Sequence, residues 1–299
     1  MYTKYRRKTM YEMRLKALAK INLGLDVIRR REDGYHEVKM IMQTIRLYDR
    51  IVMRKRRESK IQVKTNLFYL PENENNLVYK AAKLLIEEFK IQQGVQIDLQ
   101  KFIPVAAGMA GGSSDAAAVL YGINRMFHLG LSLEELMERG VKIGADVPYC
   151  LMRGTALAEG IGEQLTKLSP VPQCKILIAK PAISVSTKFV YENLKLDENT
   201  VHPDIDLLIQ DIETKNLADM AAHMGNVLES VTIPNYPVIA QIKEQMIKDG
   251  ALNAMMSGSG PTVFGIFDDK EKAEVAYKRM REGNLAKQVY LTEVYNNGR

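Results

Sequence analysis

The sequence predicts an α+β fold of two domains, and three observations lead to that prediction. Early segments such as Arg14–Ile28 alternate apolar and polar residues, as strands do. Later segments place apolar residues three and four positions apart, which is the period of helices. Two prolines in the short bridge Leu168–Pro172 mark a boundary. We therefore expect domains over residues 13–168 and 169–299, preceded by a basic extension over residues 1–12.

The first domain begins with strands. Val38–Met53 and Lys60–Lys64 continue the alternation of the first strand, and the polar segment Arg31–Gly34 predicts a turn before them. Val95–Leu99 alternates in the same way and predicts a half-buried strand.

Helices follow these strands. Asn76–Phe89 places its apolar residues on one stripe, which predicts an amphipathic helix. A second helix is expected over about Ser113–Phe127. A third begins after Ser132, because Glu135 stands three residues later and completes a capping-box pattern.

The second domain mixes strands and helices, which favours an α+β arrangement. Cys174–Ala179 predicts a buried strand, and Pro237–Gly250 predicts a helix with proline at its start and glycine at its end. A lysine- and glutamate-rich helix is expected from Lys270. The remaining strands are expected over Ala251–Met256, Thr262–Phe267 and Gln288–Glu293.

Composition excludes several classes of protein. The chain has 299 residues, and no apolar run in it is long enough to span a bilayer. Its start lacks the apolar core of a signal peptide, so we expect a cytoplasmic protein. Cys150 and Cys174 are too few for a disulfide framework and lie among apolar residues, which predicts buried free thiols.

The net charge of +6 is concentrated in Arg29–Arg31 and Arg54–Arg57. These runs could attract an anionic substrate or a nucleic acid. We favour solvated hairpin ends, because tryptophan is absent and few aromatic residues interleave with the basic runs.

The most informative segment is Pro104–Ala118, in which small residues lead into a predicted helix. Its three glycines carry no Cβ, so the backbone can approach a ligand closely and adopt positive φ. N–H groups at the start of the helix have no helical partner, and the helix dipole is positive there. The segment is therefore a candidate phosphate site. The alternative is a glycine-rich turn capped by Ser113 or Ser114.

This segment differs from the common nucleotide-binding loops. It lacks the Gly-Lys-Ser/Thr end of a Walker A loop and the G-x-G-x-x-G spacing of a dinucleotide site. The chain also lacks the His-Arg-Asp and Asp-Phe-Gly motifs of protein kinases.

Two charged residues are candidates for chemistry. Alternation places Lys20 on the same strand face as Asn22, where it could serve as a cation beside a substrate hydroxyl. The alternative is a lysine on an edge strand that reaches solvent. Asp146 precedes Val147-Pro148, and the proline should hold Val147 in extended geometry. Asp146 is either a general base or a turn aspartate that bonds to its own backbone.

Three other features are weaker. Tyr35 and His36 follow a turn and could bind a planar ring, or they form an exposed hairpin tip. Ser257–Thr262 is a loop of small residues that would let two backbones meet. The remaining histidines have no spacing that suggests a metal: His128, His202 and His223.

Taken in order, these segments resemble the GHMP small-molecule kinase family. The three motifs of the family match Ala17–Leu23, Pro104–Ala118 and Met256–Phe264. Within the family, Asp33–His36 and Gly144–Pro148 resemble the branch that phosphorylates the 2-hydroxyl of 4-diphosphocytidyl-2-C-methyl-D-erythritol with ATP. The resemblance implies a ribosomal-protein-S5-domain-2-like N-terminal domain and a ferredoxin-like C-terminal domain.

The resemblance also implies roles for individual residues. Lys20 and Asp146 match the catalytic pair, and we expect their side chains to lie within hydrogen-bonding reach of each other. The implied ATP-binding residues are Asn76, Lys101, Pro104, Ala106, Ala107, Gly108, Met109, Ala110, Gly111, Gly112, Ser113 and Ser114. The implied substrate-binding residues are Asn22, Tyr35, His36, Thr187 and Tyr191, with the two tyrosines stacking on cytosine.

Mg²⁺ is implied as a cofactor and no metal-binding residue is assigned, although Ser113, Ser114 and, less strongly, Asp115 are candidates. We expect a monomer or weak homodimer that binds neither nucleic acid nor membrane. The alternatives are a family member acting on homoserine, mevalonate or a sugar, a decarboxylase of the same fold, and a nucleic-acid-binding protein without enzymatic activity.

Overall fold

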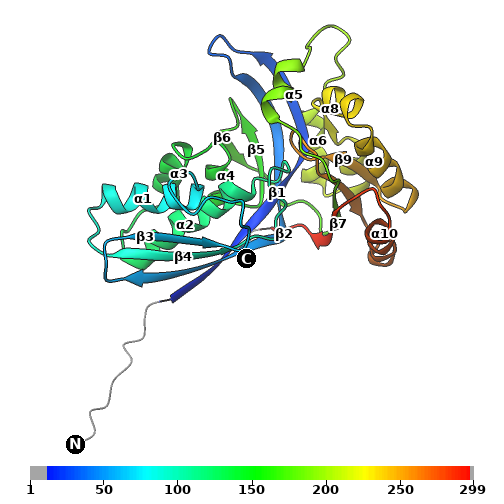
Figure 1. Cartoon of the computed structure of the whole chain (residues 1–299). Helices are drawn as coiled ribbons and strands as arrows, with labels where there is room; N and C mark the ends of the chain where they lie inside the picture. The colour runs from blue at the N-terminus through cyan, green and yellow to red at the C-terminus, as the bar shows by residue number, and fades with distance from the viewer. Residues whose placement is uncertain (1–11, 297–299) are drawn as a thin grey trace, which may run out of the picture.

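The structure is a computed structural model, and it describes residues 12–296. The extension predicted over residues 1–12 lies outside this range apart from Glu12. Figure 1 shows two lobes joined by the long strands β1 and β2. The mixed α+β architecture predicted from the sequence is confirmed.

The N-terminal lobe is a sheet covered by helices (Figure 1). Its strands are β1 (Glu12–Arg30), β2 (His36–Arg56), β3 (Ile61–Thr65), β4 (Gly94–Gln100), β5 (Thr155–Glu159) and β6 (Gln164–Lys167). The strand order is β3-β4-β2-β1-β8, and β5 pairs with both β2 and β6. The helices are α1 (Leu77–Glu88), α2 (Gly111–Phe127), α3 (Leu133–Val141) and α4 (Val147–Met152).

Strand β1 is central rather than an edge, because it pairs with β2 on one side and β8 on the other. Its register with β2 shifts between Leu18 and Lys20 and again between Asn22 and Gly24. Side chains of β1 consequently pack into both hydrophobic cores of the protein. The interpretation of Lys20 as an edge-strand lysine is therefore wrong, and this residue is only 5% exposed.

The C-terminal lobe contains a four-stranded antiparallel sheet in the order β11-β7-β10-β9. These strands are β7 (Lys175–Lys180), β9 (Asn253–Met256), β10 (Val263–Phe267) and β11 (Gln288–Glu293). The order 4-1-3-2 with helices between the strands is ferredoxin-like. The helices are α5 (Thr187–Asn193), α6 (Ile205–Thr214), α7 (Leu217–Ala222), α8 (Glu229–Asn235), α9 (Val238–Lys248) and α10 (Lys270–Glu282).

One strand crosses between the lobes. The short strand β8 (Gly225–Asn226) follows α7 in the chain but pairs in parallel with Gly24 and Leu25 of β1. The Asn226 side chain also donates to the carbonyls of Met256 and Gly258, each at 2.8 Å. These bonds fix the loop after β9 against the N-terminal sheet.

Helix boundaries confirm some local predictions and correct others. Ser132 and Glu135 form the expected capping box at the start of α3. Helix α2 begins at Gly111, two residues before the predicted start at Ser113. Val147 is helical rather than extended, because Pro148 occupies the first turn of α4, where a missing N–H breaks no helical bond. Both cysteines are buried free thiols, as predicted. Among residues 12–296, no helix is long and apolar enough to cross a membrane.

Candidate active site

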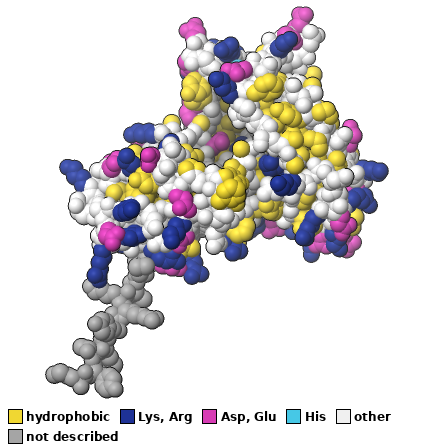
Figure 2. Space-filling model, in the orientation of Figure 1, with side chains coloured by type: hydrophobic (Ala, Val, Ile, Leu, Met, Phe, Trp, Pro, Cys, Tyr) yellow, Lys and Arg dark blue, Asp and Glu magenta, His cyan; other side chains and the backbone are white. Residues whose placement is uncertain are grey.

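A cavity of about 510 Å³ lies between the two lobes. Its lining includes β1, the loop before α1, the glycine-rich loop Pro104–Ala110 with the start of α2, Asp146, and the segments Val185–Tyr191 and Gly258–Gly260. Figure 2 shows the surface recessed between the two lobes. Segments that are far apart in the sequence thus meet in one place.

The glycine-rich loop exposes backbone donors to this cavity. Ala110 is the N-cap of α2 in a left-handed conformation, and no side chain caps the helix. The first helical bond runs from the Ser114 N–H to the Ala110 carbonyl (2.8 Å). The N–H groups of Gly111, Gly112 and Ser113 therefore have no acceptor within the helix. This arrangement favours an anion, because the positive end of the α2 dipole lies at the same point.

Strand β1 holds the loop from one side. The Lys20 N–H donates to the Met109 carbonyl (3.2 Å), and the Ser114 hydroxyl donates to the Leu18 carbonyl (2.6 Å). Both Met109 and Ser114 are buried, and neither lines the cavity. These two bonds anchor the loop to β1, and the assignment of Met109 and Ser114 to the ATP site stays a prediction. The Ser114 hydroxyl already has a backbone acceptor, which leaves Ser113 as the serine that faces the cavity.

A second loop holds the glycine-rich loop from the other side. Gly108 has φ +71°, and a Cβ added there would lie 2.0 Å from the Ser257 carbonyl oxygen. The Ser257 hydroxyl donates to the Gly108 carbonyl at 2.9 Å. The prediction that Ser257–Thr262 lets two backbones meet is confirmed, and glycine at position 108 makes this contact possible.

Lys20 and Asn22 share one face of β1, as alternation predicts. The Lys20 Nζ donates to the Asn22 Oδ1 at 2.6 Å, and both side chains are buried. Asp146 lines the same cavity. Within the described part of the chain, however, no ion pair joins Lys20 to Asp146, so their expected hydrogen-bonding contact is absent. The ammonium is instead held by the neighbouring amide.

Asp146 stands at the N-cap of α4, yet its carboxylate caps no helical N–H. The interpretation of Asp146 as a turn aspartate bonded to its own backbone is therefore not supported. Its charge acts on two neighbours. Burial raises the pKa of Tyr191 to about 12, and the negative charge of Asp146 adds to the shift. Burial likewise raises the pKa of the Cys150 thiol, with a smaller contribution from Asp146. Both groups keep their protons at neutral pH.

Only some of the predicted substrate-binding residues line the cavity. Tyr191 lines the cavity and contacts the His36 ring, with centroids 5.0 Å apart and planes tilted by 44°. Thr187 also lines the cavity, and its hydroxyl is 2.8 Å from the Ser259 hydroxyl. Tyr35 is 61% exposed, and neither Tyr35 nor His36 lines the cavity. Of the two tyrosines predicted to stack on cytosine, only Tyr191 therefore lines the cavity in this structure.

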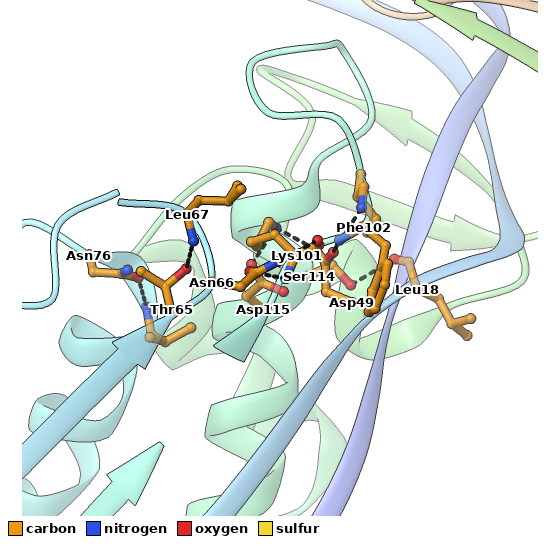
Figure 3. Close-up of polar contacts among 12 residues, drawn as sticks. Leu18, Asp49, Thr65, Asn66, Leu67, Asn76, Lys101, Phe102, Ser114 and Asp115 are labelled. Atoms are coloured by element: carbon orange, nitrogen blue, oxygen red, sulfur yellow. Dashed lines mark hydrogen bonds and ion pairs between the residues drawn. The ribbon is translucent and has the colours of Figure 1, made fainter. Parts of the chain in front are cut away.

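Asn76 and Lys101 line the cavity, but their side chains have protein partners. The Asn76 Oδ1 accepts from the Val78 N–H (3.0 Å) and caps α1, and its Nδ2 donates to the Pro71 carbonyl (2.7 Å). The Lys101 ammonium bonds to the carboxylates of Asp49 and Asp115 (Figure 3). The assignment of Asn76 and Lys101 to the ATP site stays a prediction, since both residues line the cavity while their side chains bond to the protein.

The buried carboxylates around Lys101 shift its titration. Burial lowers the pKa of the Lys101 ammonium, but the charges of Asp115 and Asp49 outweigh that effect, and the net shift is upward. Burial raises the pKa of Asp115 well above its usual range, although the Lys101 charge opposes the shift.

Some lining residues were missed by sequence reasoning. These residues are Leu25, Met40, Leu70, Pro71, Asn75, Leu77, Leu99, Val105, Ile161, Val185 and Gly258–Gly260, and only Val105 and Gly258–Gly260 lie in segments matched as family motifs. Most are apolar or small, so only their proximity in the fold identifies them. The close backbone approach predicted for Ser257–Thr262 was the signal that could have identified Gly258–Gly260 as lining residues.

Across residues 12–296, no group of three or more His, Cys, Asp or Glu side chains could hold a metal ion. The candidate site nevertheless suits Mg²⁺ bound mainly through phosphates, which needs only one or two protein oxygens. The Ser113 hydroxyl and the carboxylates of Asp115 and Asp146 line the cavity and could supply such oxygens.

Two family models match the chain. The model of the GHMP kinases N-terminal domain matches residues 76–154, and that of the GHMP kinases C-terminal domain matches residues 208–284. The first range contains the glycine-rich loop and Asp146.

Relatives match over nearly the whole length. The chain is 61% identical over 286 residues to a 4-diphosphocytidyl-2-C-methyl-D-erythritol kinase of Lachnospira eligens, covering 96% of this chain and 99% of that protein. A crystal structure of 4-(cytidine 5'-diphospho)-2C-methyl-D-erythritol kinase is 30% identical, with a TM-score of 0.82 over 96% of this chain and 100% of that one. A homoserine kinase of Cytophaga hutchinsonii shares the fold, with 20% identity and a TM-score of 0.78 over 97% of each chain.

These matches agree with the cavity, the anion-binding helix start and the ferredoxin-like second lobe. The chain belongs to the GHMP kinase family of ATP-dependent kinases, where it groups with the 4-diphosphocytidyl-2-C-methyl-D-erythritol kinases.

Proposed function

We propose that this kinase transfers the γ-phosphoryl group of ATP to the 2-hydroxyl of 4-diphosphocytidyl-2-C-methyl-D-erythritol. The single observation that supports this most is the cavity in which the uncapped start of α2, Asp146 and Tyr191 meet. The wall of the cavity offers backbone donors for phosphates, a carboxylate and, from the C-terminal lobe, an aromatic ring.

The start of α2 would hold the triphosphate. The N–H groups of Gly111, Gly112 and Ser113 have no helical acceptor and can donate to phosphate oxygens. Phosphoryl transfer depends mainly on alignment and on stabilisation of charge, and fixed backbone donors supply both. Mg²⁺ bound to the phosphates would neutralise further charge, with Ser113 as the candidate protein ligand.

Asp146 would orient the acceptor hydroxyl and accept its proton. Its carboxylate is not used as a helix cap, so its oxygens are available to a substrate. Lys20 would stabilise the oxygen that develops negative charge, because its ammonium is buried in the cavity wall and fixed by Asn22 at 2.6 Å. In this geometry the lysine acts on the substrate rather than through a direct contact with Asp146.

The C-terminal lobe would bind the cytidine end. Tyr191 offers a ring face that His36 supports from the side at 5.0 Å between centroids. Stacking at this remote end would position the hydroxyl at Asp146, so that binding energy far from the reacting atoms contributes to rate. Tyr35 is 61% exposed and would complete a clamp only after moving toward the cavity.

A nucleic-acid-binding role has less support. On the face shown in Figure 2, lysine and arginine side chains are interspersed with aspartate and glutamate. Strong binding of nucleic acid favours a continuous basic surface.

A substrate panel tests the proposal. Purified protein with Mg²⁺ and ATP is incubated with the cytidine-diphosphate alcohol, homoserine, mevalonate or galactose, and ADP release is measured. We expect turnover with the first alcohol alone. Preferential turnover of homoserine, mevalonate or galactose would assign a different acceptor to the same phosphate site.

A further inference from the structure

The glycine-rich loop is closed at its base by a buried ion-pair cluster. Lys101 precedes the loop and Asp115 follows it, and the Lys101 Nζ lies 2.6 Å from the Asp115 Oδ2. The same ammonium bonds to Asp49 of β2. Figure 3 shows the three side chains converging beneath the start of α2. We refer to Asp49, Lys101 and Asp115 as the neck cluster.

Each member ties a different element to the loop. The Asp49 Oδ1 accepts from the backbone N–H groups of Phe102 and Ile103, the latter at 2.8 Å. The Lys101 N–H donates to the Asn66 Oδ1 at 2.8 Å, which connects the loop before α1. The cluster thus joins β2, the end of β4, the start of α2 and a second loop that lines the cavity.

The position of the ammonium is unusual. A Cβ added to Gly111 would lie 3.2 Å from the Lys101 Nζ, so the positive charge lies against the first residue of α2. The start of a helix is already positive and disfavours a cation, unless acidic groups compensate. Asp49 and Asp115 supply that compensation, and all three side chains are at most 4% exposed.

Burying the three charged side chains of the neck cluster costs free energy. Burying charges carries a large desolvation penalty, and well-packed apolar residues often replace a buried pair without loss of stability. The Asp115 Oδ1 also has no hydrogen-bond partner among the residues that the structure describes. Stability alone therefore gives little reason for three buried charges at this point.

We propose that the neck cluster is a positioning device that fixes the glycine-rich loop in its phosphate-binding shape and thereby sets the affinity for ATP. The loop itself is rich in small residues and cannot rigidify its own backbone. Joining its two ends by an ion pair removes that freedom before the nucleotide arrives, which is how preorganisation raises affinity. Lys101 and Asp115 also line the cavity, whereas Asp49 does not, so Asp49 acts on the nucleotide through the loop alone.

The test measures the dissociation constant of Mg²⁺–ATP by calorimetry, without any acceptor alcohol. Asp115→Asn keeps the shape of the side chain and removes its charge. Asp49→Asn is the second variant, because Asp49 does not line the cavity and cannot touch a ligand there. We expect the dissociation constant to rise about 10- to 100-fold in each, the usual range for losing a hydrogen bond to a charged group.

Asp249→Asn is the matched control. Its buried carboxylate pairs with Arg279 and accepts from the Gln245 Nε2 at 2.9 Å, and it lies in the C-terminal lobe away from the cavity. The control should lower the melting temperature and leave ATP binding unchanged. If the neck variants lose only melting temperature, as the control does, the neck cluster is merely structural and the proposal is overturned.

Steady-state kinetics separate positioning from chemistry. In Asp49→Asn, whose side chain does not line the cavity, we expect the KM for ATP to rise, while kcat at saturating ATP and the KM for the alcohol stay within about threefold. A fall in kcat with unchanged KM for ATP would contradict positioning of the nucleotide.

This inference rests on the proposed use of the loop as a triphosphate site, but the two can fail separately. Wild-type protein that binds Mg²⁺–ATP without phosphorylating the cytidine-diphosphate alcohol would refute the acceptor and leave the neck cluster testable. Wild-type turnover of that alcohol with unaffected ATP binding in both neck variants would refute the neck cluster alone.

Discussion

Substituting Gly108 by alanine tests the contact between the two loops that form the phosphate site. An alanine Cβ would lie 2.0 Å from the Ser257 carbonyl oxygen, and position 108 has φ +71°. A tolerable contact needs more than 3 Å, so the loops must separate by about 1 Å or the backbone must change conformation. Both effects destabilise the protein.

The magnitude follows from two contributions. A side chain in left-handed backbone costs roughly 1–2 kcal/mol. Separation of the loops breaks the bond from the Ser257 hydroxyl to the Gly108 carbonyl, now 2.9 Å, at a cost of about 0.5–1.5 kcal/mol. We expect a loss of stability of roughly 1.5–3.5 kcal/mol. Because misplacement of about 1 Å costs up to about 100-fold in rate, kcat/KM for ATP should also fall by roughly 10- to 100-fold.

Gly130→Ala is the control for backbone strain. Gly130 has φ +76°, and a Cβ added there would meet nothing within 4 Å. This variant should lose only roughly 1–2 kcal/mol and keep its kcat/KM for ATP. Thermal unfolding reports the difference, since each kcal/mol lowers Tm by about 2–4 °C in domains of this size. If Gly108→Ala matches the control in both Tm and kcat/KM, the loop contact does not shape the site.

Three other outcomes are expected. Asp146→Asn should lower kcat by roughly 10²- to 10⁴-fold with little change in the KM for ATP, and near-normal turnover in rapid-mixing assays would remove Asp146 from the role of base. Tyr191→Ala should raise the KM for the cytidine-diphosphate alcohol by the equivalent of roughly 1–3 kcal/mol, whereas Tyr191→Phe should leave this KM unchanged. A KM in Tyr191→Ala equal to that of the wild type would exclude stacking. Since burial raises the pKa of Asp115, in contact with Lys101 and Asp49, the native state holds that proton more tightly than the unfolded state does. Its contribution to stability is then present at low pH and is lost as pH rises through the raised pKa. As pH rises above the ordinary aspartate pKa of about 3.9, Tm should therefore change less in Asp115→Asn than in the wild type, and parallel profiles would contradict the shift.

Local patterns predicted much of the fold. The alternation in β1 identified a strand and placed Lys20 beside Asn22, because side chains of a strand repeat every two residues. The capping box at Ser132 and the glycine-rich start of α2 could also be predicted, since both depend on neighbours within a few residues.

Long-range contacts were not predictable in the same way. The neck cluster joins Asp49, Lys101 and Asp115 from three elements, and no spacing rule relates these positions. Helix α4 was missed because a proline usually keeps the preceding residue extended, whereas here it occupies the first helical turn. Strand β8 has only two residues and is a strand only because it pairs with β1, which no local pattern predicts.

The expected bond between Lys20 and Asp146 shows the limit most clearly. The motif matches correctly predicted that both residues line one cavity. They did not predict the bond of the Lys20 ammonium to the Asn22 Oδ1 at 2.6 Å. Which partner a buried lysine takes depends on distances of a few ångströms, and alternation along a strand does not give such distances.

Phosphorus NMR of the reaction product tests the central claim most directly. The protein, Mg²⁺ and ATP are mixed with 4-diphosphocytidyl-2-C-methyl-D-erythritol, and the phosphorus spectrum is followed. The account predicts a new monoester resonance that grows in step with ADP, while the two diphosphate resonances of the alcohol persist. ATP consumed without that monoester, or no consumption at all, would contradict it.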